Sequence, residues 1–177
     1  MLLNDDPKKD DKSLLAGTMK FMALERLQFT VTYKMTIQCT YRHDLESFFY
    51  VFLLGCIEFE GEDDAAEVIE LHKWSSNNID LNYGTKLTYM TKFCRYILDM
   101  FSTSFFDLKD LVIKLRNILF GEAPPELGTP DHPNPMYEGM KAAFTNTIEQ
   151  IRVKKNISKF ELAAHVCSTL ANKLSMY

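Results

Sequence analysis

The segment from Leu45 to Ile57 constrains the fold of this chain more than any other part of the sequence. Its apolar residues recur at helical spacing, and Tyr50, Val51 and Leu54 make the remaining sides of the same helix apolar as well. A helix that is apolar all around is buried, either in a protein core or in a membrane. Spanning a membrane takes about 20 consecutive apolar residues, and this segment is much shorter. We therefore predict a helix at the centre of a soluble fold, with no membrane partner.

Further segments show helical periodicity or helix caps. They cover residues 63–74, 87–101, 107–121, 137–151 and 158–174. Asp107 is the expected N-cap of one helix and Gly121 its C-terminal stop. Ser158 with Glu161 forms a capping box for the last helix, whereas the proline-rich residues 122–135 indicate an irregular loop. The predicted fold is mainly α, with about six helices, at most one or two short strands, and a single domain.

Residues 29–41 follow a different pattern, in which apolar and polar side chains alternate strictly from Phe29 to Tyr41. Alternation with β-branched residues predicts a strand. No partner strand is visible in the sequence, and an isolated strand is not stable alone. Two interpretations stay open: an edge strand that pairs with another chain, and an irregular loop that packs its apolar side on the domain.

Composition excludes several functional classes. The 177 residues include 24 Asp and Glu against 20 Lys and Arg, for a net charge of −4, and a nucleic-acid binder is expected to carry a basic face. The four cysteines, Cys39, Cys56, Cys94 and Cys167, are far apart and form no zinc-binding pair. The N-terminus lacks the apolar run of a signal peptide. We expect an intracellular protein, cytoplasmic or nuclear, that binds no nucleic acid.

Motif searches find no catalytic site by spacing alone. The four histidines are isolated from one another, and neither a Gly-x-Ser-x-Gly elbow nor a Walker loop is present. An acidic cluster near the N-terminus, Asp5-Asp6 with Asp10-Asp11, leaves two interpretations open. It is either a cation site or a solvated group of charges in a mobile arm.

Two segments together resemble protein kinases. Residues 17–25, Gly-Thr-Met-Lys-Phe-Met-Ala-Leu-Glu, resemble the end of a kinase activation segment. Residues 41–51, Tyr-Arg-His-Asp-Leu-Glu-Ser-Phe-Phe-Tyr-Val, resemble the central F helix in the fungal-type protein kinase family. Shorter matches follow in the same order at residues 115–121, 128–130 and 136–137. The resemblance covers roughly residues 2–151 and implies the helical C-terminal lobe of a protein-kinase-like fold.

The resemblance assigns structural roles to three residues. Asp44 takes the position of the F-helix aspartate, which holds the catalytic loop by accepting backbone hydrogen bonds, although a simple helix N-cap is an alternative. Glu25 takes the position of the activation-segment glutamate that pairs with an arginine. Arg116 is the first candidate for that arginine, and the pair either belongs to the kinase-like arrangement or only stabilises the fold.

The same resemblance assigns substrate and metal positions. Thr18 and Phe21 fall where the family seats its peptide substrate, with Thr18 against the catalytic loop. Asp5 falls at the magnesium-binding aspartate. Its neighbours Asp6 and Pro7 differ from the family pattern, so the metal position is vestigial.

The motifs that phosphoryl transfer requires are absent from the sequence. It has no glycine-rich phosphate loop, and Arg42-His43-Asp44 has the wrong order for a catalytic loop. Phe49 stands where that loop needs an asparagine. We therefore expect no catalytic residue and no cofactor for this chain, whereas the intact family uses ATP and magnesium. Whether the chain is an enzyme is left open, because the family is catalytic and these motifs are missing.

Three functions stay open. The first is a truncated, inactive kinase-like lobe that docks a peptide or protein partner. The second is part of an active Ser/Thr kinase whose other parts are supplied elsewhere or lost in gene annotation. The third is a helical scaffold unrelated to phosphorylation. Apolar surface left uncovered on the lobe, or residues 29–41, also makes self-association an expectation.

The resemblance divides the chain into five parts. They are a mobile activation-segment remnant (1–16), the end of that segment (17–27), an insertion (28–41), a helical core (42–153) and a C-terminal helix (154–177).

Overall fold

The structure is a computed structural model that describes residues 19–58, 71–121 and 124–155. Six α-helices have their bounds within these residues, joined by three short 3-10 helices, and no strand occurs in them. In chain order the elements are α2 (Leu24–Tyr33), α3 (Tyr41–Glu58), η1 (Lys73–Ser75), α5 (Ile79–Thr91), α6 (Phe93–Tyr96), η2 (Leu98–Met100), η3 (Thr103–Leu108), α7 (Lys109–Phe120) and α8 (Asn134–Lys155). The predicted mainly α fold with about six helices is confirmed.

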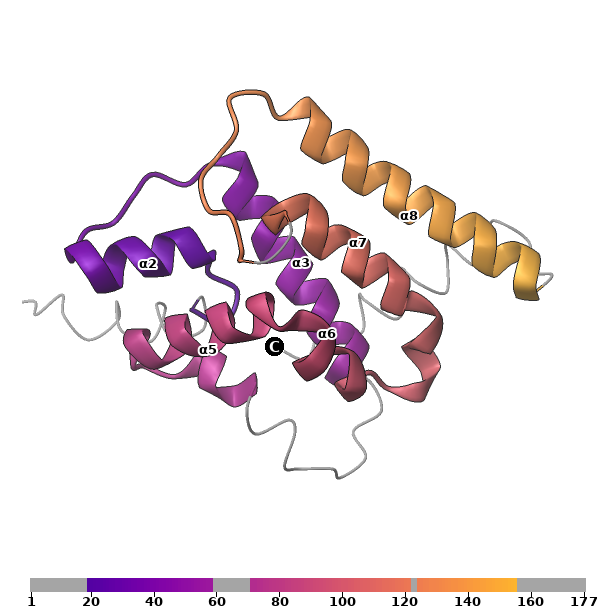
Figure 1. The fold of residues 1–177 in the computed structure, drawn as a ribbon, viewed down its shortest axis with the longest axis horizontal. Helices are drawn as coiled ribbons and strands as arrows, with labels where there is room; N and C mark the ends of the chain where they lie inside the picture. Colours follow the sequence, from indigo (N-terminus) through magenta and orange to yellow (C-terminus); the bar gives the residue numbers. More distant parts are fainter. Residues whose placement is uncertain (1–18, 59–70, 122–123, 156–177) are drawn as a thin grey trace, which may run out of the picture.

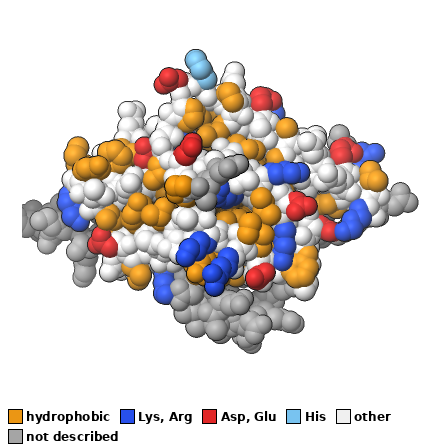
Figure 2. All heavy atoms as spheres, viewed as in Figure 1, with side chains coloured by type: hydrophobic (Ala, Val, Ile, Leu, Met, Phe, Trp, Pro, Cys, Tyr) orange, Lys and Arg blue, Asp and Glu red, His pale blue; other side chains and the backbone are white. Residues whose placement is uncertain are grey.

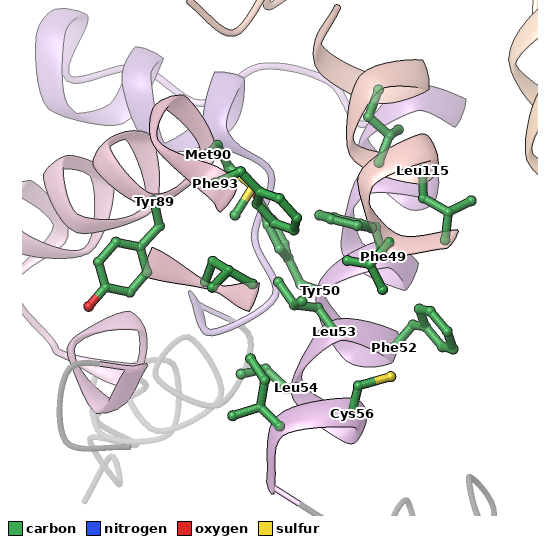
Figure 3. Close-up of a cluster of buried hydrophobic side chains, with 14 of the residues drawn as sticks. Phe49, Tyr50, Phe52, Leu53, Leu54, Cys56, Tyr89, Met90, Phe93 and Leu115 are labelled. Atoms are coloured by element: carbon green, nitrogen blue, oxygen red, sulfur yellow. The ribbon is translucent and has the colours of Figure 1, made fainter. Parts of the chain in front are cut away.

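Helix α3 forms the centre of the molecule, as its apolar sequence predicts. Phe49, Tyr50 and Leu53 have no exposed surface, and Figure 3 shows side chains from several elements converging on them. The ring of Phe49 lies 6.1 Å from that of Phe93 and 6.4 Å from that of Phe120, measured between centroids. Because other helices cover most of α3, most of its apolar side chains are satisfied by protein contacts, although Phe48 is 47% exposed. No helix in the described ranges is long and apolar enough to cross a bilayer.

The other helices pack around α3 as two pairs. Helix α2 lies alongside α5, and α8 lies alongside α7 on the opposite side of α3 (Figure 1). Helix α7 buries Leu111, Leu115 and Leu119, whose spacing of four places them on one face. Helix α8 contributes Phe144, whose ring meets Phe52 edge to face at 5.3 Å. Most of the remaining surface of α8 is exposed or half-buried.

The strand predicted for residues 29–41 is wrong. Phe29 to Tyr33 continue helix α2, the following residues 34–40 are irregular, and Tyr41 begins α3. Within α2, Leu24 and Leu27 are buried, and the rings of Phe29 and Tyr33 lie 5.1 Å apart one helical turn from each other. Side chains four residues apart are neighbours on a helix surface but lie far apart along a strand. The helical face is buried against α5, whereas no strand in the described residues offers a ladder to pair with.

Other predicted boundaries shift. The predicted helix 87–101 is three elements, because α5 starts earlier, at the Asn78 cap, and ends at Thr91. Asp107 does not cap α7, which begins at Lys109; its carboxylate instead contacts the Lys154 ammonium at 2.5 Å.

Two loop features agree with the predictions. Gly121 ends α7 with a φ of 67°, as expected for a glycine stop. Residues 124–133 form the irregular proline-rich connection. Most of the predicted helix 63–74 and the whole helix 158–174 lie outside the described residues.

Candidate docking site

The segment Met19–Leu24 is held in place by two buried charged side chains. The Lys86 ammonium of α5 donates hydrogen bonds to the carbonyl oxygens of Met19 at 3.1 Å and Met22 at 2.8 Å. The Glu46 carboxylate of α3 accepts a bond from the Leu24 backbone N–H at 2.6 Å. Lys86 and Glu46 both have no exposed surface. The two helices thus fix the backbone of Met19–Leu24.

Glu46 is the centre of a buried hydrogen-bond network on one face of α3. Its carboxylate accepts from the Tyr50 hydroxyl at 2.7 Å and from Arg42 Nη1 at 3.3 Å. Arg42 Nη2 in turn donates to the carbonyls of Leu119 at 2.9 Å and Glu126 at 2.7 Å. Residues 42, 46 and 50 are four apart and therefore share a helix face. The network links the start of α2 to the end of α7 through α3.

Burial dominates the electrostatics of this network. It raises the pKa of Glu46, although the bonds from Leu24 and Tyr50 and the charges of Arg42 and Lys86 act in the opposite direction. Burial lowers the pKa of Lys86 to about 7, and the nearby Glu46 opposes that change. The pKa of Tyr50 is raised well above its ordinary value by burial and by Glu46. Ionised groups in such a site persist only because each one is paired or hydrogen-bonded.

Aromatic rings complete the environment of Lys86. Its ammonium lies 4.4 Å from the centroid of the Tyr50 ring and 5.3 Å from that of Trp74. Asn82, one turn earlier on α5, donates to the carbonyl of Met19 at 3.4 Å and to that of Trp74. Helix α5 therefore holds the Met19 carbonyl with two side chains.

The candidate pair of Glu25 with Arg116 is corrected by the structure. Glu25 Oε2 lies 2.7 Å from Nε2 of His43, a buried side chain near the start of α3. His43 Nδ1 accepts from the Thr40 backbone N–H at 3.1 Å, so Nε2 carries the proton that is donated to Glu25. The sequence assigned no structural role to His43, whereas the structure shows that it anchors the first turn of α2.

Arg116 is an anchor in a different place. Its Nε and Nη2 donate to the Met90 carbonyl at 3.1 and 2.8 Å, and its Nη1 donates to the Asn117 side chain at 3.0 Å and to the Gly121 carbonyl. The guanidinium thus joins the end of α5 to the end of α7. Burial lowers its pKa, and the nearby Cys94 acts in the opposite direction.

The other predicted site residues are distributed as follows. Asp44 is exposed in the first turn of α3 and accepts a bond from the Cys39 thiol at 3.4 Å. Because α3 begins at Tyr41, Asp44 is not its N-cap. Phe21 is half-buried and packs against the core. Thr18 and Asp5 lie outside the described residues.

A small cavity opens beside the held segment. It has a volume of about 110 Å³. Its lining residues are Met19, Met22, Arg26, Leu27, Thr30, Thr36, Ile37 and Ile79. Close to it in sequence, Tyr33 and Met35 are 59% and 61% exposed, and Figure 2 shows hydrophobic side chains gathered over α2 and the segment that follows it. Among the described residues, no group of three His, Cys, Asp or Glu side chains is arranged to hold a metal ion.

Sequence reasoning missed the two residues that matter most here, Glu46 and Lys86. The sequence did contain a signal for Glu46. Arg42, Glu46 and Tyr50 can all form hydrogen bonds, and they are spaced four residues apart in a helix that is largely apolar. Lys86 gave no such signal, since its partners lie more than 20 residues away in the sequence.

Comparison with known proteins gives one finding. Residues 2–56 are similar to the family described as Fungal protein kinase. The matched part contains α2 and nearly all of α3, together with Glu25, Asp44 and Glu46, but not α5, α7 or α8. No curated protein and no solved structure matches the chain.

Proposed function

We propose that this chain is a non-catalytic, protein-kinase-like lobe that docks a peptide or protein partner on the face formed by α2 and residues 34–37. The observation that carries the proposal is the double hold on Met19–Leu24 by Lys86 and Glu46. A backbone fixed in advance loses little conformational entropy when a partner binds to it. The family similarity over residues 2–56 supports the kinase-like part of the proposal.

The cavity beside this segment indicates which side chains of a partner bind there. Its volume of about 110 Å³ is somewhat below the roughly 150 Å³ that accommodates a benzene molecule, so it suits one small apolar side chain. Met22, Leu27 and Ile37 supply the apolar wall, and Arg26 supplies a positive charge at the same opening. A peptide with an aliphatic residue followed or preceded by a carboxylate fits this combination. Exposed Tyr33 extends the apolar surface.

Selection from a random peptide library tests the docking function. The full chain is expected to enrich peptides with an aliphatic residue beside an acidic one. Ile37→Asp places a charge in the cavity wall. The variant is expected to bind the selected peptide at least about tenfold more weakly, since one buried apolar contact is worth more than about 1.4 kcal/mol. The matched control is Val153→Asp, on a side chain of α8 that is 79% exposed. Failure to enrich any peptide, or equal loss in both variants, contradicts the proposal.

A second function has one observation in its favour. The Asp44 carboxylate is exposed, and the resemblance assigns that position to the residue that holds a catalytic loop. This is compatible with a kinase whose catalytic loop comes from outside the described residues. Thermal unfolding with ATP and magnesium separates the two functions, because a bound nucleotide stabilises the fold by mass action. The docking lobe is expected to show no shift in Tm, and a shift that depends on nucleotide concentration would favour the kinase.

A further inference from the structure

A second and larger cavity lies between the α5–α6 corner and α7, away from the docking face. It has a volume of about 520 Å³, within the usual range of small-molecule sites. Its lining residues are Thr91, Lys92, Phe93, Cys94, Arg95, Ile113, Arg116 and Asn117. These residues belong to none of the contacts that hold Met19–Leu24.

The cavity concentrates positive charge in a chain that is acidic overall. Lys92, Arg95 and Arg116 contribute three cations, and none of the eight lining residues is a carboxylate. The whole chain carries a net charge of −4. Like charges gathered around a hollow repel one another, and a bound anion relieves that repulsion. Figure 2 shows Lys and Arg side chains among hydrophobic ones on the α5–α6 part of the visible face.

The three cationic side chains differ in exposure and in how firmly they are held. Arg116 is only 5% exposed and is fixed by its bonds to Met90, Asn117 and Gly121. It therefore adds a positive charge whose position does not change on binding. Lys92 and Arg95 are exposed, so their side chains are able to close on a ligand. Because the Asn117 oxygen accepts from Arg116, the amide nitrogen of Asn117 keeps its donor capacity.

The remaining lining residues are Thr91, Phe93, Cys94 and Ile113, of which Phe93 and Ile113 supply the large apolar side chains. Phe93 is 4% exposed and Ile113 is half-buried; the ring of Phe93 belongs to the core cluster in Figure 3. The combination matches a ligand with a strongly anionic head and an apolar body. Among biological anions, a phosphate monoester carries close to two negative charges and three acceptor oxygens at neutral pH, which suits several cations better than a single carboxylate does. We propose that this cavity binds a phosphate monoester attached to an aromatic or aliphatic body.

Calorimetric titration of the full chain with phenyl phosphate tests the proposal. Inorganic phosphate tests the anion without the body, and phenol tests the body without the anion. Phenyl phosphate is expected to bind most tightly of the three, with an affinity that falls as salt is added. The variant Lys92→Gln with Arg95→Gln is expected to bind it at least about tenfold more weakly, because it removes two charge-assisted contacts.

A matched double variant controls for net charge. Lys141→Gln with Lys154→Gln removes the same number of charges from exposed positions on α8, outside the cavity and outside the docking face, and is expected to leave the affinity unchanged. Alkylation of Cys94, an exposed thiol in the cavity wall, gives an independent readout by mass spectrometry. Bound phenyl phosphate is expected to slow alkylation at Cys94 and not at the exposed Cys39, which lies outside the cavity.

A phosphotyrosine hexapeptide is titrated in parallel. It shows whether the phosphate monoester that binds is a phosphorylated side chain or a free small molecule. Binding tighter than that of phenyl phosphate identifies a phosphorylated side chain as the ligand, and equal or weaker binding identifies a free ester. The proposal is overturned if phenyl phosphate binds no better than inorganic phosphate. It is equally overturned if the two double variants lose affinity to the same extent, or if Cys94 gains no protection.

Discussion

At the scale of single residues, Glu46 has the most demanding environment in the described part of the chain. It has no exposed surface and accepts bonds from Leu24, Tyr50 and Arg42. Glu46→Leu removes all three acceptor contacts and leaves the Arg42 charge buried without its carboxylate. Breaking a buried pair by removing one partner typically costs about 3–5 kcal/mol. We expect a loss of that size in the free energy of unfolding, measured by urea denaturation.

A double-mutant cycle shows whether the loss arises from the Arg42–Glu46 pair. Arg42→Met combined with Glu46→Leu replaces both charges by apolar side chains of similar size. The double variant is expected to be less destabilised than the sum of the single variants by at least about 1 kcal/mol, since contacting residues couple. Strict additivity would mean that the ion pair adds nothing to the bonds that each residue makes elsewhere. The double variant also keeps the test open if Glu46→Leu alone does not fold.

Lys86 gives the fold a dependence on pH. Its pKa is lowered to about 7, chiefly by burial, whereas an unfolded lysine titrates near 10.4. Between these values the unfolded chain binds more protons, so stability rises with pH by up to about 1.4 kcal/mol per unit. The stability gained when Lys86 is neutral is fully present above the unfolded pKa, and it is lost as the pH falls through about 7.

The lysine is tested by comparing variants at two pH values. Between about pH 7.5 and about pH 9.5, wild type is expected to gain on the order of 2 kcal/mol relative to Lys86→Met. Urea unfolding at each pH measures the difference. Lys141→Met, on a side chain that is 69% exposed, serves as the control and should track wild type. A constant difference between wild type and Lys86→Met would show that Lys86 titrates normally.

At the scale of the element, alanine substitutions at two glycines are expected to change stability in opposite directions, because the two glycines differ in backbone conformation. Gly84 lies inside α5, and a Cβ added there meets nothing within 4 Å. Gly84→Ala is expected to stabilise the fold by about 1 kcal/mol through helix propensity. Gly121 has a φ of 67°, where a Cβ is strained, so Gly121→Ala is expected to destabilise by about 1–2 kcal/mol.

Thermal unfolding distinguishes the two glycine variants, because about 1 kcal/mol moves the Tm of a chain of this length by roughly 2–4 °C. Gly84→Ala should raise the Tm and Gly121→Ala should lower it. A rise for both would mean that Gly121 does not keep its positive φ at the end of α7, and a fall for both would mean that α5 is not helical at Gly84.

Sequence patterns correctly predicted the elements whose structure follows from their own residues. The apolar run of α3, the stripe of α7 and the stop at Gly121 were all predicted, because propensity and spacing point to the same structure. The pattern failed at residues 29–33, where alternation fits a strand and helical burial against α5 decides otherwise. It also failed at Lys86 and Glu25, whose partners Met19 and His43 are brought near only by folding.

At the scale of the whole molecule, α3 separates two unlike halves. On one side, α2 and α5 enclose Met19–Leu24 and depend on buried charges. On the other side, α7 and α8 pack mainly through apolar side chains such as Leu115 and Met140, although Arg42 and Arg116 donate to carbonyls at the end of α7. Figure 1 shows the two pairs on opposite sides of α3. Since local stability follows the contacts of each region, the two halves are expected to respond differently to the loss of one buried charge.

Hydrogen exchange of Lys86→Met tests this division. The variant leaves the carbonyls of Met19 and Met22 without their donor, so amides at the start of α2, including Leu24 and Leu27, are expected to exchange faster. Amides of α7 should keep their protection, because the Arg116 bonds between α5 and α7 do not involve Lys86. Lys141→Met should change neither region. Equal acceleration throughout would show that the fold opens only as one unit, and the held segment would then have no stability of its own with which to order a docking face.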